Sequence, residues 1–506
     1  MFIAEQLKGQ VDLTPDHTIT SFNGRVTSYA DFYQKAKNVA THFQRKGYKK
    51  EDIIALYLHN SDYFLICYYA CQIGGFTVLP INIKLTGREV EYILNHSEAK
   101  AVIYDERLKE TLEGISPKLI HVQDTVVVGN ADAEVRLEDL IDGSDEGFVE
   151  PERSDEDTAV IFYTSGTTGK PKGVMLTNKN TFATAQIWSE SMKLNSSDRM
   201  HIVAPLFHCA ASHVFSIPII YSGGTLIIEE GFSPEQTLRT MEEEKATIFF
   251  GVPAMYAILL NTETIKEANL SDLRLFTYGA SPMPYELVKR VKSLFPEVKL
   301  QNLYGQTENS PAATSLTDEH VLTKVGSVGR PLPMTEIQIV NEFGEPLPAG
   351  EVGEIVVKGP QVMKGYLKNE DETRKALRNG WLYSGDLGKM DEDGLLYIVD
   401  RKKDMIIRGG ENVYPLEVEE VLFERPEILE AAVIGIPHEV YGEVPKAYIV
   451  LKPGQTLSEE SVLDYCKERL AKYKIPTDIE FIDSLPRNAS GKVLKTVLRE
   501  KQTIVY

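Results

Sequence analysis

The order of helix-like and strand-like segments in the N-terminal part of this chain limits it to one fold class. Helical spacing of apolar residues over Tyr29–Gly47 precedes an apolar, strand-like run at Ile53–Leu58. A second helical segment, Ser61–Gly74, precedes a second strand-like run at Thr77–Ile81. Strands that alternate with helices in this way pair in parallel and are covered by helices. The pattern therefore predicts an α/β fold with parallel sheets.

Changes of composition divide the chain further. The acidic, turn-rich stretch 142–157 predicts a surface connection between two α/β subdomains. Strand-like runs at Ile337–Val340 and Gly353–Lys358 indicate a small β-rich subdomain. From Arg401 onward the segments indicate compact α+β material of about 100 residues, the size of a small domain. We therefore predict an N-terminal domain at residues 1–400, with those three subdomains, and a small, mobile C-terminal domain at residues 401–506.

Charge and cysteine content exclude several classes of protein. The net charge of −20 argues against broad nucleic-acid binding, which needs a basic surface. Four cysteines in 506 residues make no disulfide scaffold, and Cys67 and Cys71 are expected to be buried thiols on one helix. The N-terminus lacks the pattern of a signal peptide, and no apolar run reaches the roughly 18 residues of a spanning helix. We therefore expect a cytoplasmic protein.

The most informative segment is Tyr163–Lys172, with the sequence YTSGTTGKPK. Its glycines let backbone N–H groups approach an anion, its hydroxyls donate hydrogen bonds, and its lysines supply charge. This composition suits a polyphosphate. The common P-loop needs four residues between its glycines, whereas only two separate Gly166 from Gly169, and Pro171 follows Lys170. We therefore expect a mobile lid over phosphates, without a helix that opens beneath them.

This string resembles the signature loop of the adenylate-forming superfamily, which includes acyl-CoA synthetases, aryl-CoA ligases, luciferase and adenylation domains. The resemblance extends from about Ser28 to Lys501 and is nearest to bacterial medium- and long-chain fatty acid–CoA ligases. It implies a two-step reaction, in which ATP and an acid form an acyl-adenylate that then transfers its acyl group to CoA. The residues of the loop that it assigns to ATP are Thr164, Ser165, Gly166, Thr167, Thr168, Gly169, Lys170 and Lys172.

A second signature, YGQTE, starts at Tyr304 and follows Asn302. The resemblance implies that Glu308, with Thr164, binds Mg²⁺, an ion that prefers oxygen ligands and bridges to substrate phosphates. It also implies that Thr307 contacts the α-phosphate and that Tyr304 stacks on adenine. Further nucleotide contacts are expected from Asn302, Gly305 and the segment Gly279, Ala280 and Ser281.

Two further motifs resemble the ribose-binding and hinge segments of this superfamily. Asp386, in WLYSGD, would accept hydrogen bonds from the ribose hydroxyls, and Arg401 would reach the same sugar. Arg401 belongs to the basic run DRKK, in which Asp400 and Lys403 correspond to the hinge. By the same resemblance, the C-terminal domain turns about this hinge between the two steps.

The C-terminal motifs would serve the two steps in turn. The loop Gly409, Gly410, Glu411 and Asn412 resembles the thioester-step loop, along whose glycines a pantetheine arm could pass. Lys492, in PRNASGK, would be the catalytic lysine of the adenylation step. Its ammonium would bridge the substrate carboxylate and the α-phosphate and stabilise the charge that develops there.

By the same resemblance, the acyl pocket involves His208, Cys209, Ala210, Val214, Gly279, Gly305 and Pro311. Most of these residues are small or apolar, and His208 would be a gate beside the acid with a catalytic role. The absence of a second cation disfavours diacids. Small residues at four of these positions favour a fatty acid, with an aromatic acid as the alternative.

Other functions stay open from sequence alone. The acceptor could be a separate carrier protein in place of CoA, and the oligomeric state could be a homodimer. A nucleotide-binding regulator without turnover is disfavoured by the intact Glu308, Asp386 and Lys492. The expected cofactors and substrates are Mg²⁺, ATP, CoA and a small carboxylic acid.

Overall fold

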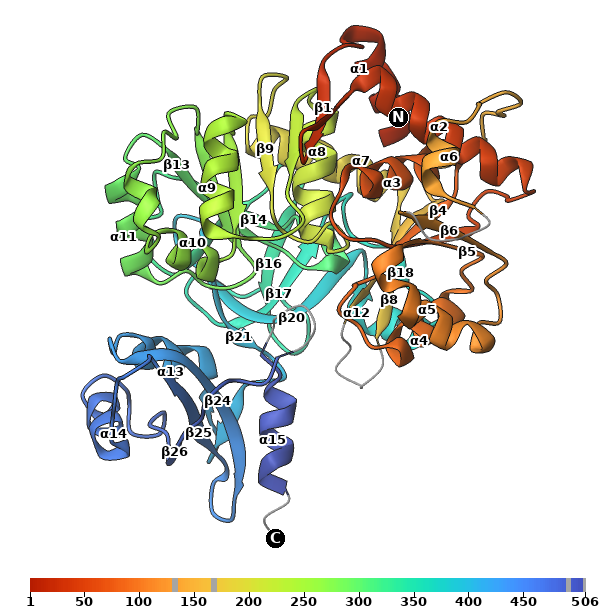
Figure 1. Cartoon of the computed structure of the whole chain (residues 1–506). Helices are drawn as coiled ribbons and strands as arrows, with labels where there is room; N and C mark the ends of the chain where they lie inside the picture. The colour runs from red at the N-terminus through yellow and green to blue at the C-terminus, as the bar shows by residue number, and fades with distance from the viewer. Residues whose placement is uncertain (130–134, 165–170, 488–492, 504–506) are drawn as a thin grey trace. The chain divides into compact units, whose positions relative to one another are not determined.

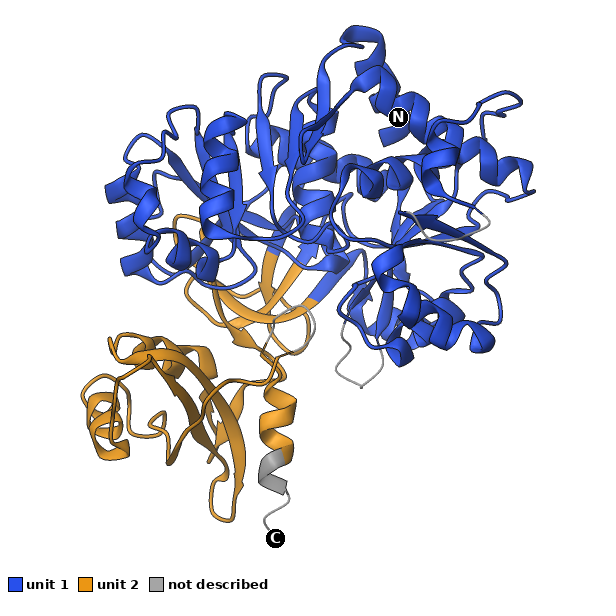
Figure 2. Cartoon of the chain, in the orientation of Figure 1, with its two compact units in different colours: residues 1–337, 357–383 blue, residues 338–356, 384–506 orange. Residues whose placement is uncertain are grey.

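The structure is a computed structural model that describes residues 1–129, 135–164, 171–487 and 493–503 (Figure 1). The chain divides into two compact units (Figure 2). The first unit contains residues 1–337 and 357–383, and the second contains residues 338–356 and 384–506. The boundary expected between residues 400 and 401 lies inside the second unit and stays a prediction.

One sheet of the first unit is built from strands that are almost wholly apolar. Its order is β18 (Gly365–Tyr366), β8 (Lys172–Thr177), β7 (Thr158–Thr164), β4 (Thr77–Pro80), β3 (Ile53–Tyr57), β5 (Ala101–Asp105) and β6 (Asp124–Val128). The strands from β7 to β6 pair in parallel, whereas β8 and β18 pair antiparallel. Continuous apolar strands are typical of parallel sheets that helices cover on both faces.

A second sheet of the first unit provides the scaffold of the candidate site. Its order is β15 (Ser327–Pro331), β14 (Thr314–Leu316), β13 (Lys299–Tyr304), β12 (Leu275–Gly279), β11 (Ile248–Gly251), β9 (Arg199–Ile202), β10 (Thr225–Ile228), β1 (Thr18–Phe22) and β2 (Arg25–Ser28). The strands from β13 to β1 pair in parallel. The predicted α/β class with parallel sheets is thus confirmed.

The helices of the first unit cover these sheets. They are α1 (Ile3–Leu13), α2 (Tyr29–Arg45), α3 (Asp62–Gly74), α4 (Gly87–Ser97), α5 (Lys109–Ile115), α6 (Leu137–Ile141), α7 (Asn178–Ser191), α8 (Ile217–Tyr221), α9 (Pro234–Glu243), α10 (Pro253–Leu259), α11 (Tyr285–Leu294) and α12 (Glu370–Ala376). Helix α3 carries Cys67 and Cys71, which are free and buried as expected. None of the described helices is long and apolar enough to span a membrane.

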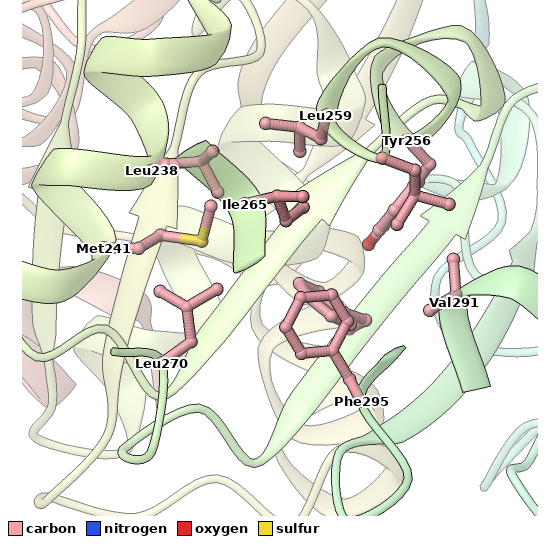
Figure 3. A pocket seen from close by; sticks show the side chains of 10 residues that line it. Leu238, Met241, Tyr256, Leu259, Ile265, Leu270, Val291 and Phe295 are labelled. Carbon is pink, nitrogen blue, oxygen red and sulfur yellow. The ribbon is translucent and has the colours of Figure 1, made fainter. Parts of the chain in front are cut away.

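A largely apolar core lies between β12 and the helices α9, α10 and α11, and the hydroxyl of Tyr256 within it donates to the carbonyl oxygen of Thr277 at 2.9 Å (Figure 3). The side chains of Leu238, Met241, Tyr256 and Phe295 point toward one another around a cavity of about 10 Å³. This volume is near the minimum for one water molecule, and the lining offers no polar partner for one. The cavity therefore belongs to the packing of the fold and is no substrate site.

In the second unit, β20 (Trp381–Met390) pairs with β21 (Leu396–Arg401), and β16 (Glu336–Val340) and β17 (Gly353–Lys358) confirm the two predicted β segments. A separate sheet has the order β23 (Glu411–Val413), β22 (Ile406–Arg408), β25 (Gly442–Leu451) and β24 (Ile428–His438), with β26 (Asp478–Phe481) beside β25. Successive side chains along β24 point to opposite faces of this sheet. Ala431 and Val433 pack with α13 (Pro415–Phe423) and α14 (Glu459–Lys467), whereas Ala432 and Ile434 pack with α15 (Lys495–Thr503).

Candidate active site

The site in the first unit forms where parallel strands end together. Tyr278 in β12 pairs with Asn302 in β13, so the segments that start at Gly279 and Tyr304 leave the sheet at the same edge. The loop that leads to His208 follows β9, which lies in the same sheet beyond β11. Ligands of open α/β sheets bind at the carboxyl ends of such strands. The structure thus brings the adenine, Mg²⁺ and acyl segments expected from the sequence to one edge.

Two glycines at this edge are required by the backbone. A Cβ on Gly279 would lie 2.5 Å from the carbonyl oxygen of Leu303, and one on Gly305 would lie 2.3 Å from the carbonyl carbon of Pro311. Both glycines are among the small residues that we expected to leave space for a fatty acyl chain. Their missing side chains instead allow neighbouring backbone to pack closely, so these two glycines leave no extra width for an acyl chain.

The nucleotide residues that follow these glycines differ in exposure. Ala280 and Ser281 are exposed, and Ala280 has a positive φ of 67°, which is uncommon outside glycine. Asn302 is buried and its amide donates to the carbonyl oxygen of Ser327 at 3.4 Å. Tyr304 and Thr307 are half-buried. The exposed Ala280 and Ser281 and the half-buried Tyr304 and Thr307 are therefore accessible to a ligand, whereas Asn302 is not.

The phosphate loop is framed by two strands. Thr164 ends β7 and pairs across the ladder with Lys172, the first residue of β8. The central loop residues Ser165, Gly166, Thr167, Thr168, Gly169 and Lys170 lie outside the described residues. After the loop, the described chain continues as β8, which pairs antiparallel with β7. The expectation of a lid without a helix beneath the phosphates concerns residues outside the described ranges and stays a prediction.

Glu308 lies in the short helical turn η5 (Thr307–Asn309) and contacts the sheet that carries the phosphate loop. Its Oε1 accepts a hydrogen bond from the Tyr366 hydroxyl at 2.9 Å. The Tyr366 ring lies under the Lys172 ammonium, 4.2 Å from Nζ to the ring centroid. Lys172 also pairs with Glu372 at 3.4 Å. The expected metal carboxylate and a lysine of the phosphate loop therefore share one neighbour, which sequence reasoning missed.

The expected acyl segment forms a π-helix, η3 (Ala210–Ser216). Such segments are rare and often occur at functional sites. His208 is exposed, and desolvation by the surrounding protein lowers the pKa of its imidazole, which favours the neutral ring. Burial, and to a lesser extent the Glu308 carboxylate, raises the pKa of the adjacent Cys209 thiol.

The other residues expected in the acyl pocket are mostly packed away. Cys209 and Val214 are buried, while Ala210 and Pro311 are half-buried. The small size of Cys209 is therefore used in the packing of the segment. Together with the two glycines, this leaves Ala210 as the remaining small residue whose size could add depth to a channel.

Asn60 holds the loop that leads to His208, and sequence reasoning did not find it. It lies after β3, is only 4% exposed, and its amide donates to the carbonyl oxygens of Ala204 at 2.8 Å and Glu229 at 3.1 Å. Its side-chain oxygen accepts from the backbone N–H of Leu206 at 2.7 Å. One side chain thus fixes two segments that are more than a hundred residues away in sequence.

Replacing Asn60 with alanine is expected to raise KM for the acid by about 10-fold and to change KM for ATP little, because the loop before His208 loses its anchor. Each buried group left without a partner also costs about 1–3 kcal/mol of stability. Steady-state kinetics and urea unfolding measure both effects. Asn38→Ala is the matched control, since Asn38 is 6% exposed and donates to the carbonyl oxygens of Ile141 and Gly143 away from this edge. Equal changes in KM for both variants would contradict a local role.

His213, within η3, is expected to make the stability of the protein depend on pH in the acid range. It is fully buried, and its Nε2 lies 2.8 Å from the Tyr68 hydroxyl. Burial lowers the pKa of its imidazole from 6.5 to about 3. Between pH 6.5 and about 3, His213 is protonated in the unfolded chain and neutral in the folded chain. Protonation therefore favours the unfolded chain, so the free energy of unfolding is unaffected by His213 above pH 6.5 and decreases as the pH falls from 6.5 toward 3.

The free energy of unfolding should therefore fall by roughly 1.4 kcal/mol per pH unit below 6.5 through this residue alone. In His213→Gln this part of the acid sensitivity is expected to vanish. Urea unfolding at pH 7 and pH 5 measures the difference between the two slopes. Parallel slopes in both proteins would show that His213 does not titrate in this way.

Asp386 and Arg401, the residues expected to bind the ribose, lie side by side in the second unit. Asp386 on β20 pairs across the ladder with Arg401 on β21, and the Arg401 Nε lies 3.6 Å from the Asp386 carboxylate. At the expected hinge, Asp400 is buried and its carboxylate accepts from the backbone N–H groups of Arg401 and Leu416. Burial raises the pKa of Asp400. Lys403, the other hinge residue, is exposed.

The expected thioester loop forms a hairpin turn between β22 and β23. Gly409 and Gly410 have φ values of 61° and 91°, which side chains disfavour, and the Gly409 N–H donates to the Tyr441 carbonyl oxygen at 2.8 Å. Glu411 and Asn412 are exposed. Lys492 lies outside the described residues.

The oxygen donors at Glu308 fit Mg²⁺. Among the described residues, no group of three or more His, Cys, Asp or Glu side chains is arranged to hold a metal ion. Mg²⁺ usually takes one or two protein carboxylates and fills its remaining positions with water and substrate phosphates. A single carboxylate suits that mode of binding, so Glu308 would be the protein carboxylate for the ion, and Thr164, the last residue of β7, is the second residue expected to bind it.

Comparison with known proteins defines the class. The sequence matches the AMP-binding enzyme family over residues 7–367 and the AMP-binding enzyme C-terminal domain over residues 417–492. The chain belongs to this family, which confirms the predicted adenylate-forming membership. It is an AMP-forming acid–thiol ligase.

Its relatives are CoA ligases. Feruloyl-CoA synthase of Amycolatopsis sp. is 36% identical over 492 residues, 97% of this chain and 96% of the relative. The 2-succinylbenzoate–CoA ligase of Bacillus licheniformis is 36% identical over 490 residues, 97% of this chain and 98% of the relative.

Solved structures share the whole fold. The o-succinylbenzoate CoA synthetase of Bacillus subtilis with its acyl-adenylate aligns with a TM-score of 0.87 and 33% identity, and covers 98% of this chain and 97% of its own. The same enzyme has been solved with ATP and a magnesium ion. A Mycobacterium tuberculosis fatty acyl CoA synthetase aligns with a TM-score of 0.81 and 33% identity, over 99% of this chain and 98% of its own.

Proposed function

We propose that this protein is an ATP-dependent ligase that joins an aromatic carboxylic acid to CoA through an acyl-adenylate. The observation that carries the choice of acid is the use of Gly279, Gly305 and Cys209 in packing. Small residues at these positions would favour a fatty acid only if they left an open channel for the acyl chain. Without that space, a compact acid fits the segment better than a long chain.

The names of the relatives support the same choice. Both sequence relatives described above are named for aromatic acids, ferulate and 2-succinylbenzoate. The fatty-acid preference expected from the sequence therefore has less support than the aromatic alternative.

In the first step, the acid carboxylate attacks the α-phosphate of ATP, forms a new C–O–P linkage and releases pyrophosphate. Such a step depends on positioning and on neutralisation of charge. In our proposal Lys172 and the rest of the phosphate loop bind the phosphates, and Glu308 holds Mg²⁺, which neutralises phosphate charge. Lys492 stabilises the charge at the reacting carboxylate and α-phosphate, and Asp386 with Arg401 holds the ribose.

In the second step, the CoA thiol attacks the carbonyl carbon of the adenylate, loses its proton and releases AMP. The glycines of the Gly409–Asn412 loop leave room along the backbone for the pantetheine arm. Desolvation lowers the pKa of His208, so in our proposal the gate beside the acid is a neutral imidazole. CoA is the proposed acceptor because the relatives are named CoA ligases.

A panel of acids tests this proposal. Pyrophosphate release is measured with ATP, Mg²⁺ and CoA for benzoate, anthranilate, cinnamate, ferulate, 2-succinylbenzoate, octanoate and palmitate, and thioesters are identified by mass. An aromatic acid should give the highest kcat/KM, by about 10-fold or more over either fatty acid, the usual scale of pocket discrimination. A palmitate optimum would restore the fatty-acid reading, and an adenylate that never reaches CoA would indicate a carrier protein.

A further inference from the structure

We propose that Tyr366 is a positioning residue that holds the Glu308 carboxylate and the Lys172 ammonium in one arrangement for Mg²⁺ and the ATP phosphates. The inference rests on the proposed roles of Glu308 and Lys172 in adenylation. It adds a residue that lies between them and belongs to neither motif.

The position of Tyr366 is fixed by its backbone. It lies on β18, where it pairs with Val174 of β8, the strand that begins at Lys172. Its N–H donates to the Thr373 hydroxyl at 2.9 Å, and that hydroxyl in turn donates to the carbonyl oxygen of Asn369 at 2.8 Å. Strand pairing and the contact with α12 thus hold the backbone from which the Tyr366 ring extends toward Glu308 and Lys172.

The hydroxyl of Tyr366 acts on Glu308. It donates to Oε1 at 2.9 Å, and the backbone of Glu308 is tied to the same region, because its carbonyl oxygen accepts from the Met363 N–H at 2.9 Å. A carboxylate has two oxygens, so one hydrogen bond at Oε1 leaves the other oxygen for a metal ion. Partners of a ligating carboxylate orient it, and their loss typically weakens metal binding.

The ring of Tyr366 acts on Lys172. The ammonium lies 4.2 Å from the ring centroid, a distance at which the ring attracts a cation. Glu372 contacts the same ammonium at 3.4 Å. The lysine is therefore held from two sides at the end of the phosphate loop, and one side chain couples its position to that of Glu308.

The test compares Tyr366→Phe with a matched control. Tyr48 is 6% exposed, as is Tyr366, and its hydroxyl donates to the Asp124 carboxylate at 2.8 Å, so Tyr48→Phe removes an equivalent hydrogen bond elsewhere. Binding of Mn²⁺ to each protein with ATP is measured by electron paramagnetic resonance of the free ion. Thermal unfolding and the Mg²⁺ concentration for half-maximal pyrophosphate release are recorded for the same proteins.

Tyr366→Phe is expected to weaken Mn²⁺ binding by about 10-fold and to raise the half-maximal Mg²⁺ concentration similarly, while Tyr48→Phe changes neither. In a Glu308→Gln background, Tyr366→Phe should add no further loss, because the carboxylate it orients is gone. Wild-type affinity in Tyr366→Phe, or an equal loss in Tyr48→Phe, would overturn the inference. Wild-type protein that binds Mn²⁺ with ATP but activates no acid would instead count against the proposed function.

Discussion

Lys492→Ala is expected to lower acid-dependent pyrophosphate release by about 10²–10³-fold, the cost of removing one group that stabilises transition-state charge. The same variant should form thioester from a supplied acyl-adenylate and CoA at close to the wild-type rate. The two steps separate because the second one breaks the bond to AMP and forms no new bond at phosphorus. Pyrophosphate release and thioester formation are assayed separately on the same preparation.

Lys472→Ala provides the control for this experiment. Lys472 is an exposed lysine of the same unit, so its loss changes net charge by the same amount. It should leave both steps unchanged. An equal loss of both steps in Lys492→Ala would contradict its proposed role as the adenylation lysine.

Glu308→Gln is expected to reduce kcat/KM for adenylation by about 10²-fold, because the amide keeps the size of the side chain and loses the charge that attracts Mg²⁺. The Mg²⁺ concentration for half-maximal activity should rise at the same time. Titrations of activity with Mg²⁺ at fixed total ATP measure both quantities.

Glu263→Gln serves as the comparison, since Glu263 is exposed in the same unit. It should behave like the wild-type protein. A Glu308→Gln variant with a normal Mg²⁺ requirement would exclude Glu308 as a ligand, even if its activity fell for another reason.

Local patterns were enough to predict much of the fold. Helix α3 was expected at Ser61–Gly74 and lies at Asp62–Gly74, where Ser61 accepts from the Phe64 N–H and Gly75 ends the helix in the left-handed region. Strand β17 was expected and found at Gly353–Lys358. Each of these segments carries its own apolar pattern and end signals, so no distant contact is needed to recognise it.

Other elements lacked such signals. The π-helix at Ala210–Ser216 has no spacing of its own, because its extra residue per turn is stabilised by buried contacts such as the one from His213 to Tyr68. Helix α15 has a largely polar sequence, and its position depends on Leu498 packing against β24 and β25. The π-helix and the position of α15 both depend on tertiary contacts between distant parts of the chain, and a single sequence does not reveal such contacts.

The candidate site shows the same division. The composition of the loop at residues 163–172 indicated phosphate binding, and the family resemblance implied the metal and ribose residues. Cross-strand pairing places Asp386 beside Arg401. Asn60 and Tyr366 were missed because their roles depend on partners 144 and 58 residues away. Gly279 was expected to leave space for an acyl chain, and its contact with the carbonyl of Leu303 on the next strand could not be seen from the sequence for the same reason.

We propose that this chain activates an aromatic acid as its adenylate and transfers the acyl group to CoA. A quenched single-turnover reaction with the preferred aromatic acid, ATP and Mg²⁺ tests it most directly, with acyl-AMP and acyl-CoA quantified by mass spectrometry before and after CoA is added. We expect acyl-AMP to accumulate without CoA and to be converted to an equal amount of aroyl-CoA once CoA is present. Absence of acyl-AMP from every aromatic acid, or an adenylate that persists in the presence of CoA, would contradict it.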